Sequence, residues 1–229
     1  MDDLVINVRN LSFRYPDGAE ALRNVDFALH RSETVAIFGA NGSGKTTFLS
    51  HLVGLLHGKG TVEVCGMPVN KANLPEVRQR VGILFQISDD QIFMPTIEED
   101  VAFGPLNMDL DPDTVRERVD RCLDQVGLNG QRERPPHHLS AGDRRRAALA
   151  GVLAMEPEII LLDEPATYLD PPGKRALVST LQELPQAKIL VTHEVAFAQA
   201  LADRAVFFEN GQVVADGGVA EIASRFDWG

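Results

Sequence analysis

The chain has few cysteines, a deficit of positive charge and no long apolar run. Its two cysteines, Cys65 and Cys122, are isolated and lack metal-ligand spacing, which is typical of reduced structural thiols in a cytosolic protein. Lys and Arg number 22 against 33 Asp and Glu, and the net charge of −11 argues against broad nucleic-acid binding. No apolar run approaches the roughly 18 residues that cross a bilayer. A membrane role would therefore require a membrane-embedded partner.

What the chain does contain fits one large α/β domain. Hydrophobic residues make up 44% and charged residues 24% of the 229 residues, as in ordinary globular proteins. The N-terminus, Met1–Leu4, is acidic and has no apolar signal-peptide core, so we expect no secretory signal. The sequence contains no internal repeat, low-complexity segment or linker, and we therefore treat residues 1–229 as a single domain.

The most informative segment is Gly39–Thr46, whose letters GANGSGKT form a complete phosphate-binding loop. Thr34–Phe38 predicts a buried strand before it and Thr47–Val53 a helix after it, the setting that such a loop requires. Backbone N–H groups of the loop can surround phosphate oxygens at the positive end of that helix. Lys45 adds charge for the β- and γ-phosphates, and the Thr46 hydroxyl can bind Mg²⁺. The predicted nucleotide contacts are Gly39, Asn41, Gly42, Ser43, Gly44, Lys45, Thr46 and Thr47.

A second chemical signal is the sequence IILLDEP at Ile159–Pro165, in which four apolar residues precede two carboxylates. The apolar residues predict a buried strand that holds Asp163 at its C-terminal end, where α/β sheets place their ligands. There Asp163 can organise the Mg²⁺ shell, and Glu164 can polarise an attacking water as a general base. The alternative is a pair of acids that merely caps a core strand, but the phosphate loop in the same chain favours the catalytic interpretation.

The rest of the chain divides into patterned regions. Alternating residues at Leu4–Val8 and Leu22–Leu29 predict a β-rich N-terminal region. Between roughly residues 87 and 154 the pattern is helical, and we expect a helical subdomain inserted in the α/β core. The core pattern then resumes, and Asn210-Gly211 predicts a hairpin with a type I′ turn.

With both nucleotide motifs in place, further elements resemble the ATPase subunits of ATP-binding cassette (ABC) transporters in order and spacing. The resemblance extends from Val5 to about Gly217. LSAGD at Leu139–Asp143 stands where the family has its Leu-Ser-Gly-Gly-Gln signature. The other matching elements are Gln86 as the glutamine loop, Tyr168–Asp170 as the aspartate loop, His193 as the switch histidine and Tyr15 as the aromatic that stacks on adenine.

The resemblance implies a P-loop ATPase fold of the ABC type, with a mixed-sheet core, an N-terminal antiparallel β-subdomain and the inserted helices. It also implies that ATP and Mg²⁺ bind between two subunits, most simply two copies of this chain. Residues implied to contact the nucleotide held by the partner are Ser140, Gly142 and Asp143. The implied Mg²⁺ ligands are Thr46, Gln86 and Asp163, and the implied catalytic residues are Lys45, Gln86, Glu164 and His193.

Two positions in the signature depart from the family pattern. Ala141 replaces glycine, and its methyl group can crowd a close backbone approach, whereas Asp143 replaces glutamine with a negative charge. Ser140 and Gly142 are retained, so the main contacts remain available. We expect a functional but weakened composite site, with Asp143 in an ion pair with one of the arginines that follow it.

The segment that begins at Phe85, beside the predicted glutamine loop, resembles one ABC group in particular. FQISDDQIF at Phe85–Phe93 and TIEEDVAFGP at Thr96–Pro105 are similar to energy-coupling factor (ECF) transporter ATPases, which import vitamins and transition-metal ions. In that group this region receives a transmembrane scaffold subunit, so we expect docking near Gln86–Gly104. The expected apolar lining is Ile87, Ile92, Phe93, Met94 and Phe103.

The compact length resembles the dedicated cobalt, nickel or biotin systems of the ECF group, in which one ATPase is used twice as a homodimer. A substrate-capture membrane protein then completes the transporter, and the ATPase lies at the cytoplasmic face of the membrane. Two alternatives remain: an importer that uses an extracytoplasmic binding protein, and a soluble ABC protein that acts on DNA or ribosomes. The single cassette and the negative charge disfavour the second.

Two clusters invite other interpretations. Arg144–Arg146 can be taken as a nucleic-acid patch, but we favour a solvated start of a helix beside the signature loop and expect no nucleic-acid partner. His137 and His138 can be taken as a metal pair, but they lack a second ligand cluster, which favours an ordinary loop.

Overall fold

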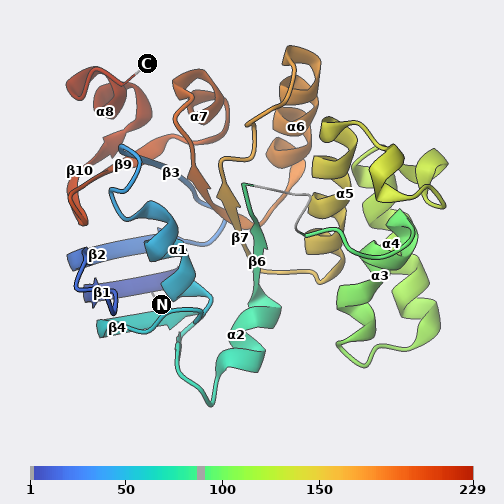
Figure 1. Ribbon diagram of the computed structural model, residues 1–229, viewed down its shortest axis with the longest axis horizontal. Helices are drawn as coiled ribbons and strands as arrows, with labels where there is room; N and C mark the ends of the chain where they lie inside the picture. The colour runs from blue at the N-terminus through green and yellow to red at the C-terminus, as the bar shows by residue number, and fades with distance from the viewer. Residues whose placement is uncertain (1–2, 87–90, 229) are drawn as a thin grey trace.

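The computed structural model describes residues 3–86 and 91–228, arranged as two sheets and a set of helices (Figure 1). The strands of the smaller sheet are β1 (Leu4–Arg14), β2 (Glu20–His30), β4 (Lys59–Val64) and β5 (Met67–Pro68). They are antiparallel, in the order β2-β1-β4-β5. β1 continues past the predicted end at Val8, with a bulge around Asn10, whose φ is 52°, where it pairs with β2.

The larger sheet contains the predicted core strands. They are β3 (Thr34–Phe38), β6 (Val81–Leu84), β7 (Ile159–Asp163), β8 (Ala187–Val191), β9 (Arg204–Glu209) and β10 (Gln212–Gly218). Their order is β10-β9-β3-β8-β7-β6, with β10 antiparallel to β9 and the other pairs parallel. Asn210 and Gly211 join β9 to β10 with positive φ values of 49° and 77°, as a type I′ turn requires. This mixed sheet beside an N-terminal antiparallel sheet confirms the predicted fold class.

Helices between β6 and β7 form a group that projects to one side of the sheets (Figure 1). They are α3 (Ile97–Leu106), α4 (Pro112–Gln125) and α5 (Ala141–Ala154), with 3₁₀ turns at Asn129–Gln131 and Pro136–His138. Each helix begins after a residue whose side chain accepts hydrogen bonds from the first turn: Thr96, Asp111 and Ser140, respectively. These caps satisfy N–H groups that a helix leaves unpaired at its start. The helix starts in this region therefore follow from local sequence.

Five further helices of the described chain lie outside the helical group. They are α1 (Lys45–Leu52), α2 (Leu74–Arg80), α6 (Pro171–Glu183), α7 (Val195–Leu201) and α8 (Val219–Arg225). α1 follows the phosphate loop directly, and α6 follows the segment that leaves β7. Within residues 3–86 and 91–228, no helix has the length and apolar character needed to cross a membrane.

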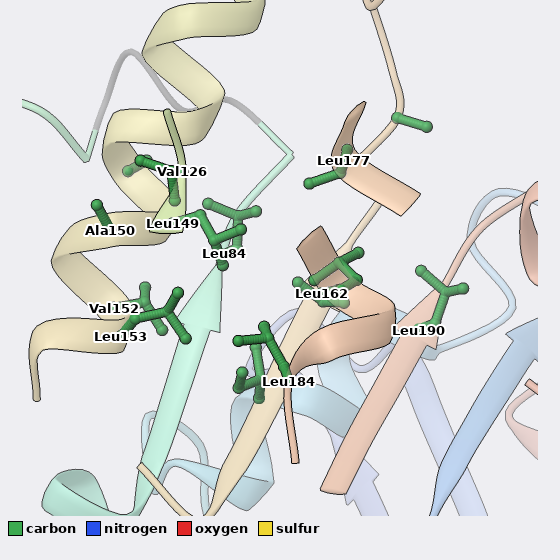
Figure 2. Close-up of a cluster of buried hydrophobic side chains, with 14 of the residues drawn as sticks. Leu84, Val126, Leu149, Ala150, Val152, Leu153, Leu162, Leu177, Leu184 and Leu190 are labelled. Carbon is green, nitrogen blue, oxygen red and sulfur yellow. The ribbon is translucent and has the colours of Figure 1, made fainter. Parts of the chain in front are cut away.

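Successive residues of each core strand bury two separate apolar clusters on opposite faces of the larger sheet. On one face, Leu84 and Leu162 pack with Leu149 of α5 and with α6 (Figure 2). On the other face, Leu161 and Ile189 join residues of the antiparallel sheet and of α1. Burial on both faces explains why these strands are continuous apolar runs in the sequence. It also holds their C-terminal ends rigidly at one edge, where the polar residues gather.

Candidate active site

A cavity of about 410 Å³ lies at the C-terminal ends of β3, β7 and β8, beside the turn between β1 and β2. It brings together the predicted residues Tyr15, Asn41, Gly42, Gly44, Lys45, Thr46, Thr47, Gln86, Asp163, Glu164 and His193. Ala19, Glu20, Ala21 and Val191 also line it. Sequence reasoning missed these four because no motif marks them; the β1–β2 connection and the end of β8 bring them to the cavity.

The phosphate loop has a conformation that its glycines permit. Gly42 and Gly44 have φ values of 79° and 107°, which L side chains rarely adopt. A Cβ at Gly44 would lie 2.6 Å from Ala21 O, and a Cβ at Gly39 would lie 2.2 Å from a backbone oxygen of β9. The loop is therefore packed closely against β2 and β9. Gly39 and Ser43 do not line the main cavity, and Ser43 lines an adjacent one beside β9.

Lys45 is buried, and carbonyl groups of the loop hold its ammonium. Nζ donates hydrogen bonds to Gly39 O at 2.6 Å and to Ala40 O at 2.9 Å. Burial lowers the pKa of Lys45, while the nearby carboxylates of Glu164 and Asp163 act to raise it. A partly desolvated cation opposite two carboxylates suits a polyphosphate that is bridged by a divalent cation.

Thr46 and Asp163 connect the phosphate loop to β7. Thr46 Oγ1 donates a hydrogen bond of 3.0 Å to Asp163 Oδ2. A hydroxyl and a carboxylate are oxygen ligands of the kind that Mg²⁺ prefers, so this pair fits the predicted ion. Burial raises the pKa of Asp163, and the Thr46 hydrogen bond and the charge of Lys45 act against that rise.

A Mg²⁺ ion here would draw on several kinds of oxygen. In the described ranges 3–86 and 91–228, no group of three or more His, Cys, Asp and Glu side chains is placed to hold a metal ion. The amide residue Gln86 does line the same cavity as Thr46 and Asp163. Hydroxyl, amide, phosphate and water oxygens would therefore have to complete the coordination. His137 and His138, the other candidate pair, pack against each other edge to face with ring centroids 4.3 Å apart.

Glu164 and His193 meet at the ends of β7 and β8. His193 Nδ1 lies 2.9 Å from Glu164 Oε2, and the Glu164 side chain is 14% exposed. The backbone N–H of Glu164 donates to Val191 O at 2.9 Å, and its φ is 48°. A left-handed φ costs a non-glycine residue about 1–3 kcal/mol and is concentrated at functional sites. This strained turn presents a carboxylate to the cavity beside an imidazole.

Tyr15 lines the same cavity from the turn that follows β1. Its hydroxyl is 3.0 Å from Thr47 Oγ1, and its ring packs edge to face on Phe13 with centroids 4.9 Å apart. Tyr15 remains 37% exposed, so a planar ligand can reach the ring.

The signature loop lies outside this cavity. Ser140, Gly142 and Asp143 line a separate cavity of about 420 Å³ together with the aspartate loop. Asp143 forms the predicted ion pair, with Arg146, and its N–H donates to Ser140 Oγ at 3.1 Å. Neither of these two cavities, as lined by residues of the described ranges, contains both the signature loop and the phosphate loop. Their predicted nucleotide contacts would therefore require a second subunit.

Arg145 departs from the expected solvated helix start, because its side chain is buried. Its guanidinium donates to the backbone oxygens of Phe85 and Gln86. The expectation of a solvated cluster is wrong at this position because α5 already begins at Ala141. Leu149 and Val152 stand four and seven residues after Arg145, so all three share the buried face of the helix. That spacing was the sequence signal that could have revealed Arg145.

An apolar groove of about 380 Å³ runs between the larger sheet and the helical group. Phe93 and Phe103 line it, as predicted, with their rings edge to face and centroids 4.8 Å apart. Phe85, Ile83 and residues of α5 complete the apolar wall.

Two of the other expected lining residues, Ile92 and Met94, do not lie in the groove. Ile92 is buried in the core cluster, and Met94 lines a different depression. Asp100 accepts hydrogen bonds from the N–H groups of Phe93 and Met94, which holds this segment in a turn that directs its side chains apart. Ile87 lies outside the described residues.

The chain is similar to known proteins in both sequence and structure. The family model described as ABC transporter matches residues 22–167. A putative ABC transporter ATP-binding protein of Streptomyces avermitilis is 50% identical over 218 residues, which cover 95% of this chain and 83% of that protein. The energy-coupling factor transporter ATP-binding protein EcfA of Carboxydothermus hydrogenoformans is 44% identical over 227 residues, covering 97% of this chain and 84% of that protein.

Solved structures show the same likeness. CbiO1 of Clostridium perfringens, described as part of the ABC transporter complex cbiONQ, has a TM-score of 0.88 at 34% identity over 98% of this chain and 92% of that chain. The ATP-binding cassette MJ0796, a dimer in a post-hydrolysis state bound to ADP and Pi, has a TM-score of 0.84 at 27% identity. That match covers 93% of this chain and 98% of the other.

Proposed function

This chain belongs to the ABC transporter family as an ATP-hydrolysing subunit, and from that membership we propose that it powers an ECF-type importer. The observation that carries the proposal is the apolar groove with Phe85, Phe93 and Phe103 on its wall. The similarity to EcfA and CbiO1 supports the same group. Cobalt, nickel or a vitamin such as biotin is the proposed cargo, and an importer with an extracytoplasmic binding protein is the alternative.

The proposed chemistry is hydrolysis of the terminal phosphate of ATP. Lys45 and the loop N–H groups bind the phosphates, and Tyr15 stacks on the adenine. Thr46, Gln86 and Asp163 would hold Mg²⁺, which neutralises charge that develops on the phosphate oxygens. Glu164 takes the proton of the attacking water as the water oxygen bonds to the γ-phosphorus and the bond to the ADP oxygen breaks. His193, 2.9 Å from that carboxylate, orients it and would contact the γ-phosphate.

We assign the working unit as a head-to-tail homodimer of single-domain chains, each with a helical subdomain of about residues 87–154. Ser140, Gly142 and Asp143 of one chain would contact the nucleotide held by the phosphate loop of the other. This arrangement accounts for the position of the signature loop, which lies outside the main cavity of its own chain.

The groove is the proposed seat of a transmembrane scaffold subunit, which would hold the ATPase at the cytoplasmic face of the membrane. Phe93 is 62% exposed and Phe103 is 43% exposed. Burying these apolar rings against an apolar helix of the scaffold would be more favourable than leaving them in water. A substrate-capture membrane protein would join this complex through the scaffold.

The test is an affinity purification from native membranes with three baits: the natural chain, Phe103→Glu and Leu106→Glu. Leu106 is exposed on the same helix but does not line the groove, so it controls for the added charge. We expect the natural chain and Leu106→Glu to recover a scaffold and a small membrane protein, and Phe103→Glu to lose both. Recovery of ribosomal or DNA-binding proteins, or equal recovery by Phe103→Glu, would contradict the proposal.

A further inference from the structure

We propose that Arg145 is a positioning residue that fixes Glu164 and the glutamine loop relative to the signature helix α5. The side chain is 3% exposed and lies five residues after Ser140, on the face of α5 that meets the larger sheet. It thus stands between the loop that would contact a partner's nucleotide and the two segments that carry Gln86 and Glu164.

The guanidinium joins three segments that are far apart in the sequence. Nη1 donates to Phe85 O and Nη2 to Gln86 O, the latter at 2.7 Å, both just after the end of β6. Nη2 also lies 3.4 Å from Glu164 O, just after the end of β7. A planar cation with donors in a fixed fork can hold several carbonyls at set positions, which a lysine ammonium does not do equally well.

Packing alone does not call for arginine at this position. Leu149 and Val152, on the same face of α5, pack in the apolar cluster of Figure 2. Burying an arginine is costly unless its donors are paired, so an aliphatic residue would suit this face equally well for stability. Arg146, the next residue, binds Asp143 and Val126 O, and both of these belong to the helical group itself. The Arg145 side chain instead binds backbone oxygens just after the ends of β6 and β7.

Two consequences follow from this geometry. A rotation of α5 would carry the backbones of Gln86 and Glu164 with it, so the position of the signature loop and that of the water-activating carboxylate are linked. Phe85 also lines the apolar groove, so a scaffold seated there would act on the same link. This second consequence rests on the proposed function, whereas the first concerns the ATPase alone.

Steady-state ATPase kinetics of the purified full chain test the inference. We expect Arg145→Met to lower kcat by about 100-fold, the size of effect that small misplacement of a catalytic group produces. KM for ATP and the affinity for a fluorescent ATP analogue should change by less than about threefold, because Lys45 and Tyr15 are untouched. Arg145→Lys retains the charge without the fork and should lose about tenfold in kcat.

Arg118→Met is the matched control, because Arg118 is a largely buried arginine that donates to Ala154 O at the other end of α5. It should retain kcat within about twofold. If Arg145→Met does not fold, Arg145→Lys tests the inference in its place, because it too should lower kcat and leave KM for ATP nearly unchanged. Natural kcat in the Arg145 variants, or an equal loss in Arg118→Met, would overturn the positioning role. Neither result would bear on groove binding, which the membrane purification tests separately.

Discussion

His193 Nδ1 lies 2.9 Å from Glu164 Oε2, a contact that links the loops after two adjacent parallel strands. The two side chains differ in exposure, with His193 at 60% and Glu164 at 14%. The carboxylate is therefore the more enclosed of the two groups, and the imidazole is the more exposed. In such an arrangement the histidine can hold a water-activating carboxylate in one orientation, and its exposed ring can contact a ligand that enters the cavity.

Replacing Glu164 by Gln should preserve ATP binding and nearly abolish turnover. The amide has almost the same shape but does not accept a proton, so we expect kcat to fall by at least about 100-fold. ATP should then hold the chain in a closed dimer, measurable by size-exclusion chromatography with and without ATP. Glu194→Gln is the control, since the Glu194 carboxylate pairs with Lys174 and does not line the cavity. Turnover by Glu164→Gln close to the natural rate would remove Glu164 as the base.

Much of the active site was predictable because its chemistry is local in the sequence. The phosphate loop and the Asp163–Glu164 pair are short motifs in a strand-to-turn setting, and the structure brings them to one cavity. The burial of Arg145 could be read from its spacing to Leu149 and Val152, but its hydrogen-bond partners could not, because they lie just after β6 and β7, far from Arg145 in the sequence. Likewise, Ile92 is buried in the core whereas its neighbour Phe93 lines the groove with Phe103. This difference depends on a turn that is held by the hydrogen bond from Phe93 N–H to Asp100, which lies seven residues further along the chain.

The Thr46–Asp163 contact should govern the requirement for Mg²⁺. In Asp163→Asn a neutral amide replaces a carboxylate, so we expect the Mg²⁺ concentration for half-maximal ATPase activity to rise at least about tenfold. Asp26→Asn, at an exposed carboxylate that accepts a hydrogen bond from Asn10 N, controls for the substitution itself. An unchanged Mg²⁺ dependence in Asp163→Asn would show that the ion does not depend on this carboxylate.

Replacing Asp143 by Gln should strengthen the composite site. The substitution removes a negative charge and the pair with Arg146 next to a loop that is expected to face a partner's γ-phosphate. An interaction between two partly exposed charges contributes up to about 1 kcal/mol. Removing the repulsion between Asp143 and the partner's γ-phosphate should therefore increase ATP-driven dimerisation by no more than about fivefold. Analytical ultracentrifugation and ATPase assays measure it, with Asp113→Gln on α4 as the control for charge. If neither quantity rises in Asp143→Gln, the signature is not weakened by its aspartate.

His51 should make stability fall on mild acidification. His51 belongs to α1, its ring is buried and packs edge to face on Phe13, and Nδ1 lies 2.8 Å from Thr47 O. Burial lowers the pKa of His51 below the 6.5 of an exposed histidine. The unfolded chain therefore binds more protons in the window just below pH 6.5, and the free energy of unfolding decreases as the pH falls through that window.

The measurement for His51 is urea denaturation at several pH values between 8 and 5, for the natural chain and for His51→Asn. Asparagine keeps a donor for Thr47 O but has no titrating ring, so the stability advantage of the natural chain should shrink on acidification. His30→Asn, at an exposed strand end, shows what the loss of any histidine does. An advantage that stays constant from pH 8 to 5 would mean that His51 does not titrate with unfolding. An advantage that grows would mean that the folded chain favours the protonated ring, so that burial is not the dominant influence on its pKa.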